Sequence, residues 1–152
     1  MKKMDDKKME TNREHMRLEM ESLSRNEEFA RVVTAVFMSR LDPTLEEVDD
    51  VKTAVSEAVT NAVIHGYRGD RGTIYLDLTA DMEERTLTVA VKDCGVGIAD
   101  VKQAMEPLFT TKPEPDRSGM GFSFMEAFMD ELEVISKPHV GTLVKMRKTI
   151  GE

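Results

Sequence analysis

This chain has no tryptophan, and aromatic residues make up only 5% of its 152 residues. It has a single cysteine, Cys94, which excludes an internal disulfide and a cysteine-based zinc site. A lone cysteine usually packs as a small hydrophobic residue, so we expect Cys94 to be buried or half-buried. Most of the 12 methionines are expected to fill the core in the same way, and an exposed subset would form an adaptable binding surface.

Long apolar stretches and an excess of positive charge are also missing. No run approaches the length that spans a bilayer, and residues 1–9 are charged without the apolar centre of a secretory signal. We therefore expect a protein that stays in the cytoplasm and does not bind a membrane. The net charge of −8 argues against direct, nonspecific nucleic-acid binding, and it is compatible with a basic protein partner.

The bulk composition indicates one soluble domain. Hydrophobic residues make up 40% of the chain and charged residues 33%, in a length that buries a real core. Residues 1–14 are polar and show no period, so we expect a disordered or frayed extension there. Residues 15–150 are then the single folded domain. Its first element is a short strand over residues 16–20, where apolar and charged residues alternate.

Two helices are predicted next. Ser24 is the expected N-cap of the first, with Glu27 completing a capping box. Its apolar positions recur at helical spacing until Leu41, before Asp42-Pro43 ends the helix; they are Phe29, Val32, Val33, Val36 and Phe37. The second helix begins after Pro43 and Thr44 and carries an apolar stripe from Val48 to Val63. It is expected to end at His65-Gly66, with the glycine as C-cap.

The remaining residues predict strands, a short helix and a second glycine-led helix. The strands are expected over 73–80, 86–92, 132–137 and 141–148, the short helix over 100–105, a loop over 107–118 and the last helix over 119–130. Helices combined with mostly hairpin-connected strands indicate an α+β fold, a two-layer α/β sandwich.

A glycine pair opens the last of these helices. Gly119-Met120-Gly121 follows two threonines, Thr110 and Thr111, and two cations, Lys112 and Arg117. Backbone N–H groups at a helix start, approached closely through glycines and flanked by cations, suit an anion such as a nucleotide phosphate chain. The alternative is an ordinary turn and helix cap.

Three polar residues form a row on the second helix. Glu57, Asn61 and His65 are spaced four residues apart, which places them on one face, with the apolar stripe on the other side. The alternative is a solvated helix face, although asparagine is a poor residue for an exposed mid-helix position. His65 either lines a pocket with the other two or simply ends the helix.

A second polar cluster follows the strand over 86–92. Asp93 comes directly before Gly95, Gly97 and Ile98. A loop aspartate is often a turn former, and that remains the alternative to a binding role.

In this order and spacing, the three clusters resemble the nucleotide-binding boxes of the ATPase superfamily that includes gyrase B, Hsp90, histidine kinases and MutL. The resemblance is closer still to the anti-sigma F factors of spore-forming bacteria. It rests on Leu41-Asp-Pro-Thr, Ser56-Glu-Ala-Val-Thr-Asn-Ala, Ile64-His-Gly-Tyr, Pro107-Leu-Phe-Thr-Thr-Lys-Pro-Glu, Arg117-Ser-Gly-Met-Gly-Phe and Met125-Glu-Ala-Phe-Met-Asp, and it runs from about His15 to about Lys148. It implies the superfamily's ATP-binding sandwich, a mostly antiparallel sheet with helices on one face.

The resemblance also implies roles for single residues. Glu57 would be the general base, Asn61 the Mg²⁺ ligand, and Asp93 the acceptor for the exocyclic amine of adenine. Arg117 would act beside the β- and γ-phosphates. The remaining ATP contacts implied are His65, Gly95, Gly97, Ile98, Leu108, Thr110, Thr111, Lys112, Ser118, Gly119, Met120, Gly121, Phe122 and Thr142. For Thr142 the alternative is an ordinary strand hydroxyl.

The function implied is that of an anti-sigma factor which is also a serine kinase. It would bind and sequester a sporulation sigma factor and phosphorylate an anti-anti-sigma protein. The first helix, with Arg31 on its polar side, would dock the partners, although a solvated arginine is equally compatible with the sequence. The strand over 16–20 has few partners in so small a domain, and it is expected to pair with a second copy in a homodimer.

Three alternatives remain open at this point. The chain could be an ATP-sensing, sigma-sequestering module without kinase activity, or a general stress-response relative. The catalytic domain of a histidine kinase is disfavoured, because none of the three histidines lies in an N-terminal helical hairpin.

Overall fold

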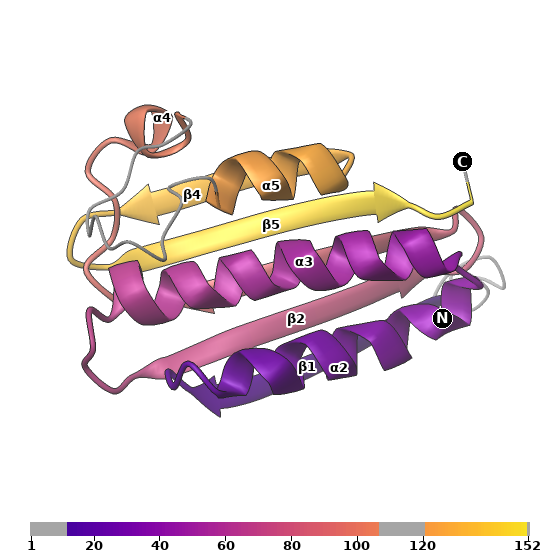
Figure 1. The fold of residues 1–152 in the computed structure, drawn as a ribbon, viewed down its shortest axis with the longest axis horizontal. Helices are drawn as coiled ribbons and strands as arrows, with labels where there is room; N and C mark the ends of the chain where they lie inside the picture. Colours follow the sequence, from indigo (N-terminus) through magenta and orange to yellow (C-terminus); the bar gives the residue numbers. More distant parts are fainter. Residues whose placement is uncertain (1–11, 107–120, 152) are drawn as a thin grey trace, which may run out of the picture.

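The structure, a computed structural model, describes residues 12–106 and 121–151 and consists of a sheet covered on one face by helices (Figure 1). The strands are β1 Arg13–Glu21, β2 Thr73–Asp81, β3 Thr86–Asp93, β4 Glu131–Lys137 and β5 Gly141–Thr149. They form one antiparallel sheet in the order β1-β2-β3-β5-β4. This arrangement confirms the predicted two-layer α+β sandwich.

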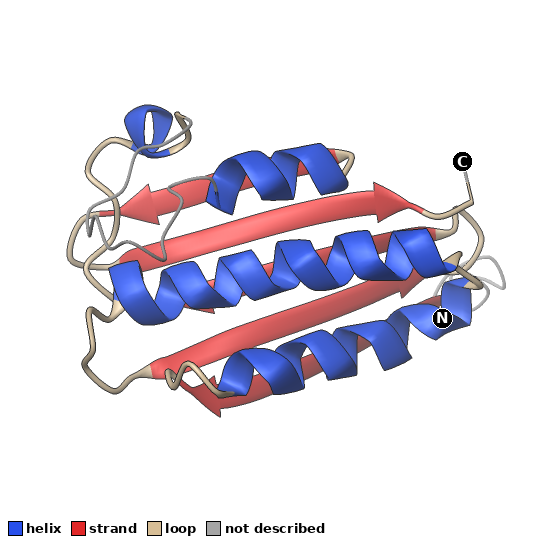
Figure 2. Cartoon of the chain, viewed as in Figure 1, coloured by secondary structure: helices blue, strands red, loops and turns tan. Residues whose placement is uncertain are grey.

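Three helices make up the second layer, as Figure 2 shows. They are α2 Asn26–Met38, α3 Leu45–Asn61 and α5 Gly121–Phe128. A 3-10 turn Ser39–Leu41 extends α2, a π-helical turn Ala62–Gly66 extends α3, and the short helix α4 Val101–Ala104 stands apart from the layer. The predicted strands and helices are therefore present, within a few residues of their expected bounds. Residues 107–120, which include the predicted loop, lie outside the described part.

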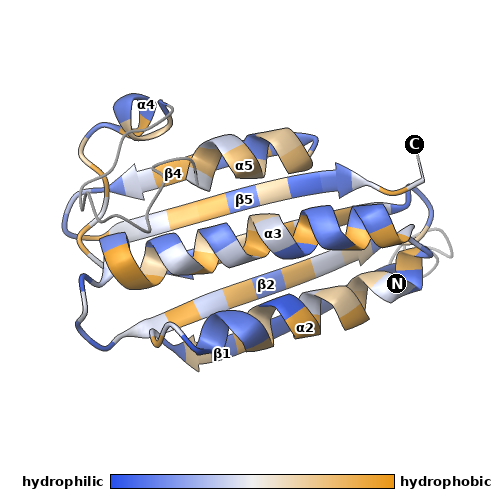
Figure 3. Cartoon of the chain, in the orientation of Figure 1, coloured by the Kyte–Doolittle hydropathy of each residue, from blue (hydrophilic) through white to orange (hydrophobic). Residues whose placement is uncertain are grey.

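The core lies between the helices and the inner face of the sheet. Buried and half-buried residues alternate along all nine positions of β2, and Figure 3 shows the matching hydrophobic and hydrophilic bands. Aliphatic side chains of α3, among them Val51, Val55 and Val59, pack onto this face. Met125 and Met146 are fully buried, as expected of methionines that fill a core.

Helix α2 buries a different face from the one the sequence predicts. Phe29, Val32 and Val36 are 64%, 52% and 62% exposed. The fully buried positions include Ala30 and Thr34 instead, and Thr34 satisfies its hydroxyl by donating to the Ala30 carbonyl at 2.7 Å. Small side chains let α2 approach α3 closely, and this leaves the larger residues outside. The apolar run predicted at helical spacing is thus divided: Phe37 faces the core, and these three residues do not.

The predicted cap of α2 was also wrong. The N-cap is Arg25, and no side chain of the described residues caps the helix. Glu27 instead accepts a short hydrogen bond from the Ser56 hydroxyl of α3 and pairs with Arg31. The Glu27 carboxylate therefore bonds to α3 and does not form a capping box with Ser24.

A complete capping box begins α3. Thr44 Oγ1 accepts from the Glu47 N–H at 3.1 Å, and the Glu47 carboxylate accepts from the Thr44 N–H at 2.9 Å. Glu47 also accepts from the Gly151 N–H at 2.8 Å, which ties the chain's C-terminal end to the helix start. Burial raises the pKa of Glu47, but these N–H donors outweigh it, and the net pKa is lowered.

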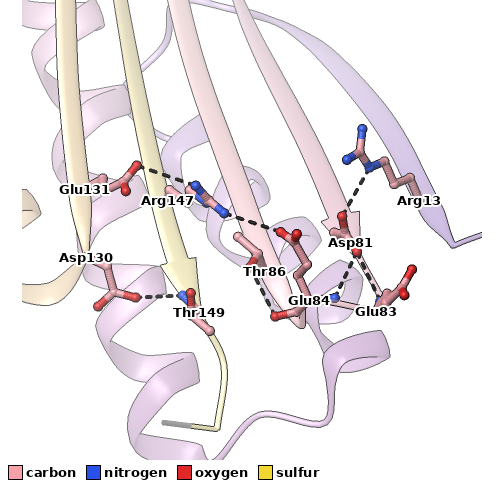
Figure 4. A network of polar contacts seen from close by, with 9 residues as sticks. All are labelled: Arg13, Asp81, Glu83, Glu84, Thr86, Asp130, Glu131, Arg147 and Thr149. Carbon is pink, nitrogen blue, oxygen red and sulfur yellow. Dashed lines mark hydrogen bonds and ion pairs between the residues drawn. The ribbon is translucent and has the colours of Figure 1, made fainter. Parts of the chain in front are cut away.

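The other face of the sheet is polar, and none of the described helices covers it. At one end, Asp81 accepts from the N–H groups of Glu83 and Glu84 and closes the β2–β3 turn (Figure 4). Arg147 lies between two carboxylates, 3.6 Å from that of Glu84 and 3.9 Å from that of Glu131. Such exposed ion pairs contribute little stability, but they keep this face hydrophilic.

Strand β1 is longer than predicted and has a partner within the domain. It pairs with β2 over all nine residues, from Arg13 opposite Asp81 to Glu21 opposite Thr73. The expectation of few partners was therefore wrong for one of its two edges. Its start at Arg13 shortens the expected N-terminal extension, of which residues 1–11 lie outside the described part. Among the described residues, no helix is long and apolar enough to cross a membrane.

The capping box predicts a measurable share of the stability. Thr44→Ala should lower the free energy of unfolding by about 1 kcal/mol, because the N–H of Glu47 loses its acceptor. Urea unfolding measures this change. Thr53→Ala is the matched control, since Thr53 bonds only to the Asp49 carbonyl within the same helix, and it should change stability by less than about 0.5 kcal/mol. Equal effects of the two substitutions would contradict the prediction.

Candidate functional site

A cavity of about 550 Å³ opens between the end of α3, the end of β3 and the start of α5. Nine of the residues predicted for a site line it: Glu57, Asn61, His65, Asp93, Gly97, Ile98, Gly121, Phe122 and Thr142. Gly95 lies directly behind this lining. The predicted residues Leu108, Thr110, Thr111, Lys112, Arg117, Ser118, Gly119 and Met120 lie outside the described residues, so their roles stay predictions.

The row of polar residues on α3 faces this cavity. Glu57, Asn61 and His65 all line it, so the alternative of a fully solvated helix face does not hold. The helix changes to a π-helical turn directly after Asn61, with the Tyr67 N–H donating to the Ala62 carbonyl at 3.0 Å. Such widened turns are often found at functional sites. His65 belongs to this turn and lines the cavity.

Gly66 does not cap the helix with a left-handed conformation, so that prediction was wrong. The C-cap residue is Tyr67, whose φ of −93° is right-handed. Gly66 is needed for space instead: a Cβ atom there would lie 2.9 Å from the carboxyl atoms of Asp93. Its carbonyl accepts from the Val96 N–H at 2.9 Å. The end of α3 and the loop after β3 are therefore in direct backbone contact.

Asp93 ends β3 and is only 5% exposed. Burial raises the pKa of its carboxyl, while hydrogen bonds from the N–H groups of Gly95 and Thr142 oppose that rise. Asp93 Oδ1 lies 2.9 Å from the Gly95 nitrogen. A carboxylate has about four acceptor positions, so capacity remains for a donor that enters the cavity. Asp93 accepts from the Gly95 N–H as a turn former does, and it also lines the cavity.

Two glycines let the loop after β3 lie against its neighbours. A Cβ on Gly95 would lie 2.1 Å from the Gly66 carbonyl oxygen. A Cβ on Gly97 would lie 2.1 Å from the Lys137 carbonyl oxygen, and the φ of Gly97 is +75°, a conformation that favours glycine. Any side chain at either position would push this wall of the cavity away from α3 or from β4.

Sequence reasoning missed two residues that hold this wall. The Tyr67 hydroxyl donates to the Thr73 carbonyl at 2.5 Å and accepts from the Cys94 N–H at 2.8 Å. Ser136 on β4 accepts from the Ile98 N–H at 2.7 Å and bonds the Thr142 hydroxyl at 2.7 Å. Tyr67 closes the Ile64-His-Gly-Tyr motif, which could have pointed to it, whereas Ser136 lies in none of the predicted clusters and only the fold brings it to the site. Further lining residues that were not predicted are Thr60, Arg68, Asp100, Gln103, Pro138 and His139.

Cys94 is exposed, which corrects the expectation of a buried or half-buried cysteine. Strand alternation explains the difference. Asp93 points inward at the end of β3, so the next residue points outward.

The start of α5 lies directly on Glu57 and Asn61. A Cβ on Gly121 would lie 3.1 Å from Asn61 Nδ2 and 3.2 Å from Glu57 Oε2. Free N–H groups at a helix start attract anions, and an amide oxygen is a hard donor that suits Mg²⁺. No cluster of three or more histidine, cysteine or acidic residues that could cage a metal occurs among the described residues. A metal at Asn61 would therefore take its other ligands from water and the bound anion.

Arg31 lies on α2, outside the cavity lining. It is 37% exposed, and its Nε is 2.8 Å from Glu27 Oε1. The pair is an ion pair rather than a hydrogen bond, since the geometry gives Nε no hydrogen-bond acceptor among the described residues. The structure does not test its predicted contact with a partner.

Comparisons with known proteins identify the family. Residues 20–148 match the family described as the histidine kinase-like ATPase domain. The chain is 55% identical over 135 residues to the anti-sigma F factor of Clostridium novyi (strain NT), covering 89% of this chain and 94% of that protein. It is 52% identical over 136 residues to the anti-sigma F factor of Shouchella clausii (strain KSM-K16), covering 89% and 92%.

A solved structure supports the fold. The RsbU and RsbW domains of a Mycobacterium tuberculosis protein match with a TM-score of 0.65 and 16% identity, covering 90% of this chain and 32% of that one. At that identity the likeness speaks for the fold alone, and it agrees with the sandwich described above. With the cavity residues in place and relatives more than half identical over nearly their whole length, the chain belongs to the anti-sigma F factors, within the histidine kinase-like ATPase family.

Proposed function

We propose that this anti-sigma factor transfers phosphate from ATP, with Mg²⁺, to a serine of an anti-anti-sigma protein, and that it sequesters a sporulation sigma factor in the cytoplasm. One observation carries the kinase proposal: Glu57, Asn61 and the helix start at Gly121 meet at one end of the cavity. These are a proton acceptor, a hard metal ligand and an anion-binding helix start. Phosphoryl transfer requires this kind of positioning and charge neutralisation more than covalent help.

The buried end of the cavity suits adenine. Asp93 accepts hydrogen bonds only, so it complements the exocyclic amine of adenine and opposes the carbonyl oxygen of guanine at the same place. Gly97 and Ile98 line the same cavity, and the side chain of Ile98 adds an apolar contact for a flat base. The triphosphate then extends towards Asn61 and α5.

Transfer itself needs few groups. The Glu57 carboxylate accepts the proton of the attacking serine hydroxyl, and the amide oxygen of Asn61 holds Mg²⁺, which when bound neutralises phosphate charge. The N–H groups at the start of α5 stabilise the same charge. Thr110, Thr111, Lys112 and Arg117 are proposed to approach the phosphates from the other side, as the resemblance implies.

The runner-up is an ATP-sensing module that sequesters the sigma factor without transferring phosphate. Such a module needs Asn61 and Asp93 but no base. The presence of Glu57 in the cavity lining therefore favours the kinase. The general stress-response relative is less favoured, because the relatives that are more than half identical to this chain over nearly their whole length are anti-sigma F factors.

Helix α2 is the proposed docking surface for the sigma factor. Its outward residues Phe29, Val32 and Val36 are large, apolar and more than half exposed, as expected of a surface that is covered by a partner. Arg31 belongs to the same helix, and we propose that its guanidinium contacts the partner.

A homodimer is proposed through the outer edge of β1. The strand ends the sheet, so its second edge has no partner strand among the described residues. The Met82 N–H donates to the Asn12 carbonyl, and the Ser22 N–H donates to the Gly72 carbonyl. Even-numbered residues therefore bond to β2, and the odd-numbered N–H groups, such as that of Glu19, point to the open edge. A second copy could add its own β1 there.

Loss of the base should separate transfer from binding. Glu57→Gln is expected to slow phosphate transfer about 10²–10⁴-fold while ATP affinity stays within about threefold, because an amide cannot accept the proton. Radiolabelled transfer from ATP to a purified anti-anti-sigma protein, together with calorimetric ATP binding, measures both. Glu46→Gln, exposed in the first turn of the same helix, is the control and should leave both values unchanged. Wild-type turnover in the Glu57 variant would exclude its role as the base.

Loss of the buried carboxylate should weaken adenine recognition. Asp93→Asn is expected to lower ATP affinity about 10–100-fold and to reduce the preference for ATP over GTP, because the amide turns a donor towards the base. Fluorescence titration with both nucleotides measures the ratio. Asp70→Asn, in the exposed turn before β2, should retain wild-type values. An unchanged ATP-to-GTP ratio in the Asp93 variant would argue against this site for the base.

The dimer proposal is tested at the edge of β1. Glu19→Pro removes an N–H group that faces the open edge and spares the bonds to β2, so it should yield a folded monomer. Sedimentation equilibrium measures the mass, and far-UV circular dichroism checks the fold. Glu19→Ala retains the N–H group and should remain dimeric. A monomeric wild type at micromolar concentration, or a dimeric proline variant, would disprove this interface.

A further inference from the structure

Tyr67 connects the end of α3 to the loop that follows Asp93. It comes directly after the π-helical turn, and its hydroxyl donates to the Thr73 carbonyl at 2.5 Å and accepts from the Cys94 N–H at 2.8 Å. The direction of both bonds is fixed, because a carbonyl oxygen only accepts and an amide N–H only donates. Burial raises the pKa of Tyr67 above its ordinary value, so the hydroxyl keeps the proton that it donates.

The ring of Tyr67 lies in a place that only a glycine neighbour permits. A Cβ on Gly72 would lie 2.2 Å from Tyr67 Cε1 and 2.5 Å from Tyr67 Cζ. The ring is half-buried and packs against the hydrophobic core. The position of the hydroxyl is therefore set by the packing of the ring as well as by its two hydrogen bonds.

The Cys94 N–H belongs to the peptide group that joins Asp93 to Cys94, so the Tyr67 hydroxyl acts directly beside the Asp93 Cα. The other side of this peptide group is restricted too. A Cβ on Gly141 would lie 2.1 Å from the Asp93 carbonyl oxygen, and the φ of Gly141 is +138°. Because a peptide group is planar, holding its N–H and its oxygen fixes the backbone from which the Asp93 side chain extends.

The carboxylate itself is held by backbone groups. The N–H groups of Gly95 and Thr142 donate to it, and a Cβ on Gly66 would lie 2.9 Å from its carboxyl atoms. The Tyr67 hydroxyl differs from these contacts because it belongs to a side chain, and Tyr67 is not among the residues that line the cavity. Removing one oxygen atom from Tyr67 therefore tests the position of the carboxylate without changing a group that faces the ligand.

We infer that Tyr67 is a positioning residue for nucleotide selection: its hydroxyl holds the peptide group after Asp93 and thereby directs the Asp93 carboxylate at the exocyclic amine of adenine. The inference rests on the proposed function, because it takes ATP as the ligand and Asp93 as the acceptor for that amine. Hydrogen bonds weaken steeply as their alignment is lost, so a small rotation of this peptide group is enough to remove the selection.

The test compares ATP with purine riboside triphosphate, in which a hydrogen atom replaces the exocyclic amine and the rest of the nucleotide is kept. Calorimetry on the full chain with Mg²⁺ should show that the wild type binds ATP about 10–100-fold more tightly than this analogue, the range for one hydrogen bond to a charged group. Tyr67→Phe should reduce the preference to about threefold or less, because the amine loses its aligned acceptor. Its affinity for the analogue should stay within about threefold of wild type, since the analogue makes no bond to the carboxylate.

A role in folding alone gives a different pattern. Tyr67→Phe would then weaken both nucleotides by the same factor and leave the preference at its wild-type value, which would overturn the inference. Tyr75→Phe is the matched control, since it removes the hydroxyl of the other tyrosine and retains the ring that contacts Arg17 and Lys92. It should leave both affinities unchanged.

A second measurement uses Asp93→Asn as the background. There Tyr67→Phe should cause no further loss of ATP affinity, because the hydroxyl acts through a carboxylate that is already missing. A further loss as large as the one in the wild-type background would contradict the inference. If Tyr67→Phe does not fold, Gly72→Ala takes its place, since the added Cβ displaces the Tyr67 ring and its hydroxyl and should cause the same loss of preference.

The wild-type measurement separates this inference from the proposed function. A wild type that prefers ATP, with the preference intact in Tyr67→Phe, would overturn the role of Tyr67 and leave the proposed function standing. A wild type that binds both nucleotides equally would contradict the proposed role of Asp93, and one that binds neither would overturn the proposed kinase. In both of these cases the inference falls with the proposal on which it rests.

Discussion

The candidate site depends on a contact between two backbones that leaves no room for side chains. The end of α3 meets the loop after β3 where Gly66 and Gly95 pack on one another, and the Gly66 carbonyl accepts from the Val96 N–H. This contact places the Asp93 carboxylate against the helix that carries Glu57 and Asn61. A Cβ atom on either glycine would push Asp93 away from Glu57 and Asn61. The cavity therefore exists because glycine occupies both sides of the contact.

The contact between Gly66 and Gly95 lies beside Asp93, whose carboxyl is buried and carries a desolvation penalty. Burial raises the pKa of this carboxyl, because desolvation disfavours its charged form. Two backbone N–H groups, from Gly95 and Thr142, offset part of the penalty. A residue that served only the fold would gain more from an apolar side chain. We propose that a ligand donor in the cavity completes the hydrogen bonds of this carboxyl.

Binding surfaces outside the cavity follow from how the sandwich is closed. Only one face of the sheet is covered by the described helices, and small residues such as Ala30 and Thr34 bring α2 close to α3. That close approach leaves Phe29, Val32 and Val36 outside. Strand β1 lies at the same side of the molecule, and one of its edges has no partner strand in the part of the chain that the structure describes. Nucleotide chemistry and partner binding can thus use different parts of one small domain.

The sequence by itself determined the order of the elements and most of the chemistry. These features follow local patterns, because the period of a short stretch sets its element and its faces. Examples are the alternation in β2 and β3, the i, i+4 row on α3 and the glycines around Asp93. Nine residues that these clusters and the family resemblance predicted line one cavity. Tertiary structure alone decided which face of α2 is buried, why Gly66 is glycine, that Cys94 is exposed and that Ser136 reaches Thr142. These features depend on surfaces supplied by residues distant in the chain, so no local pattern specifies them.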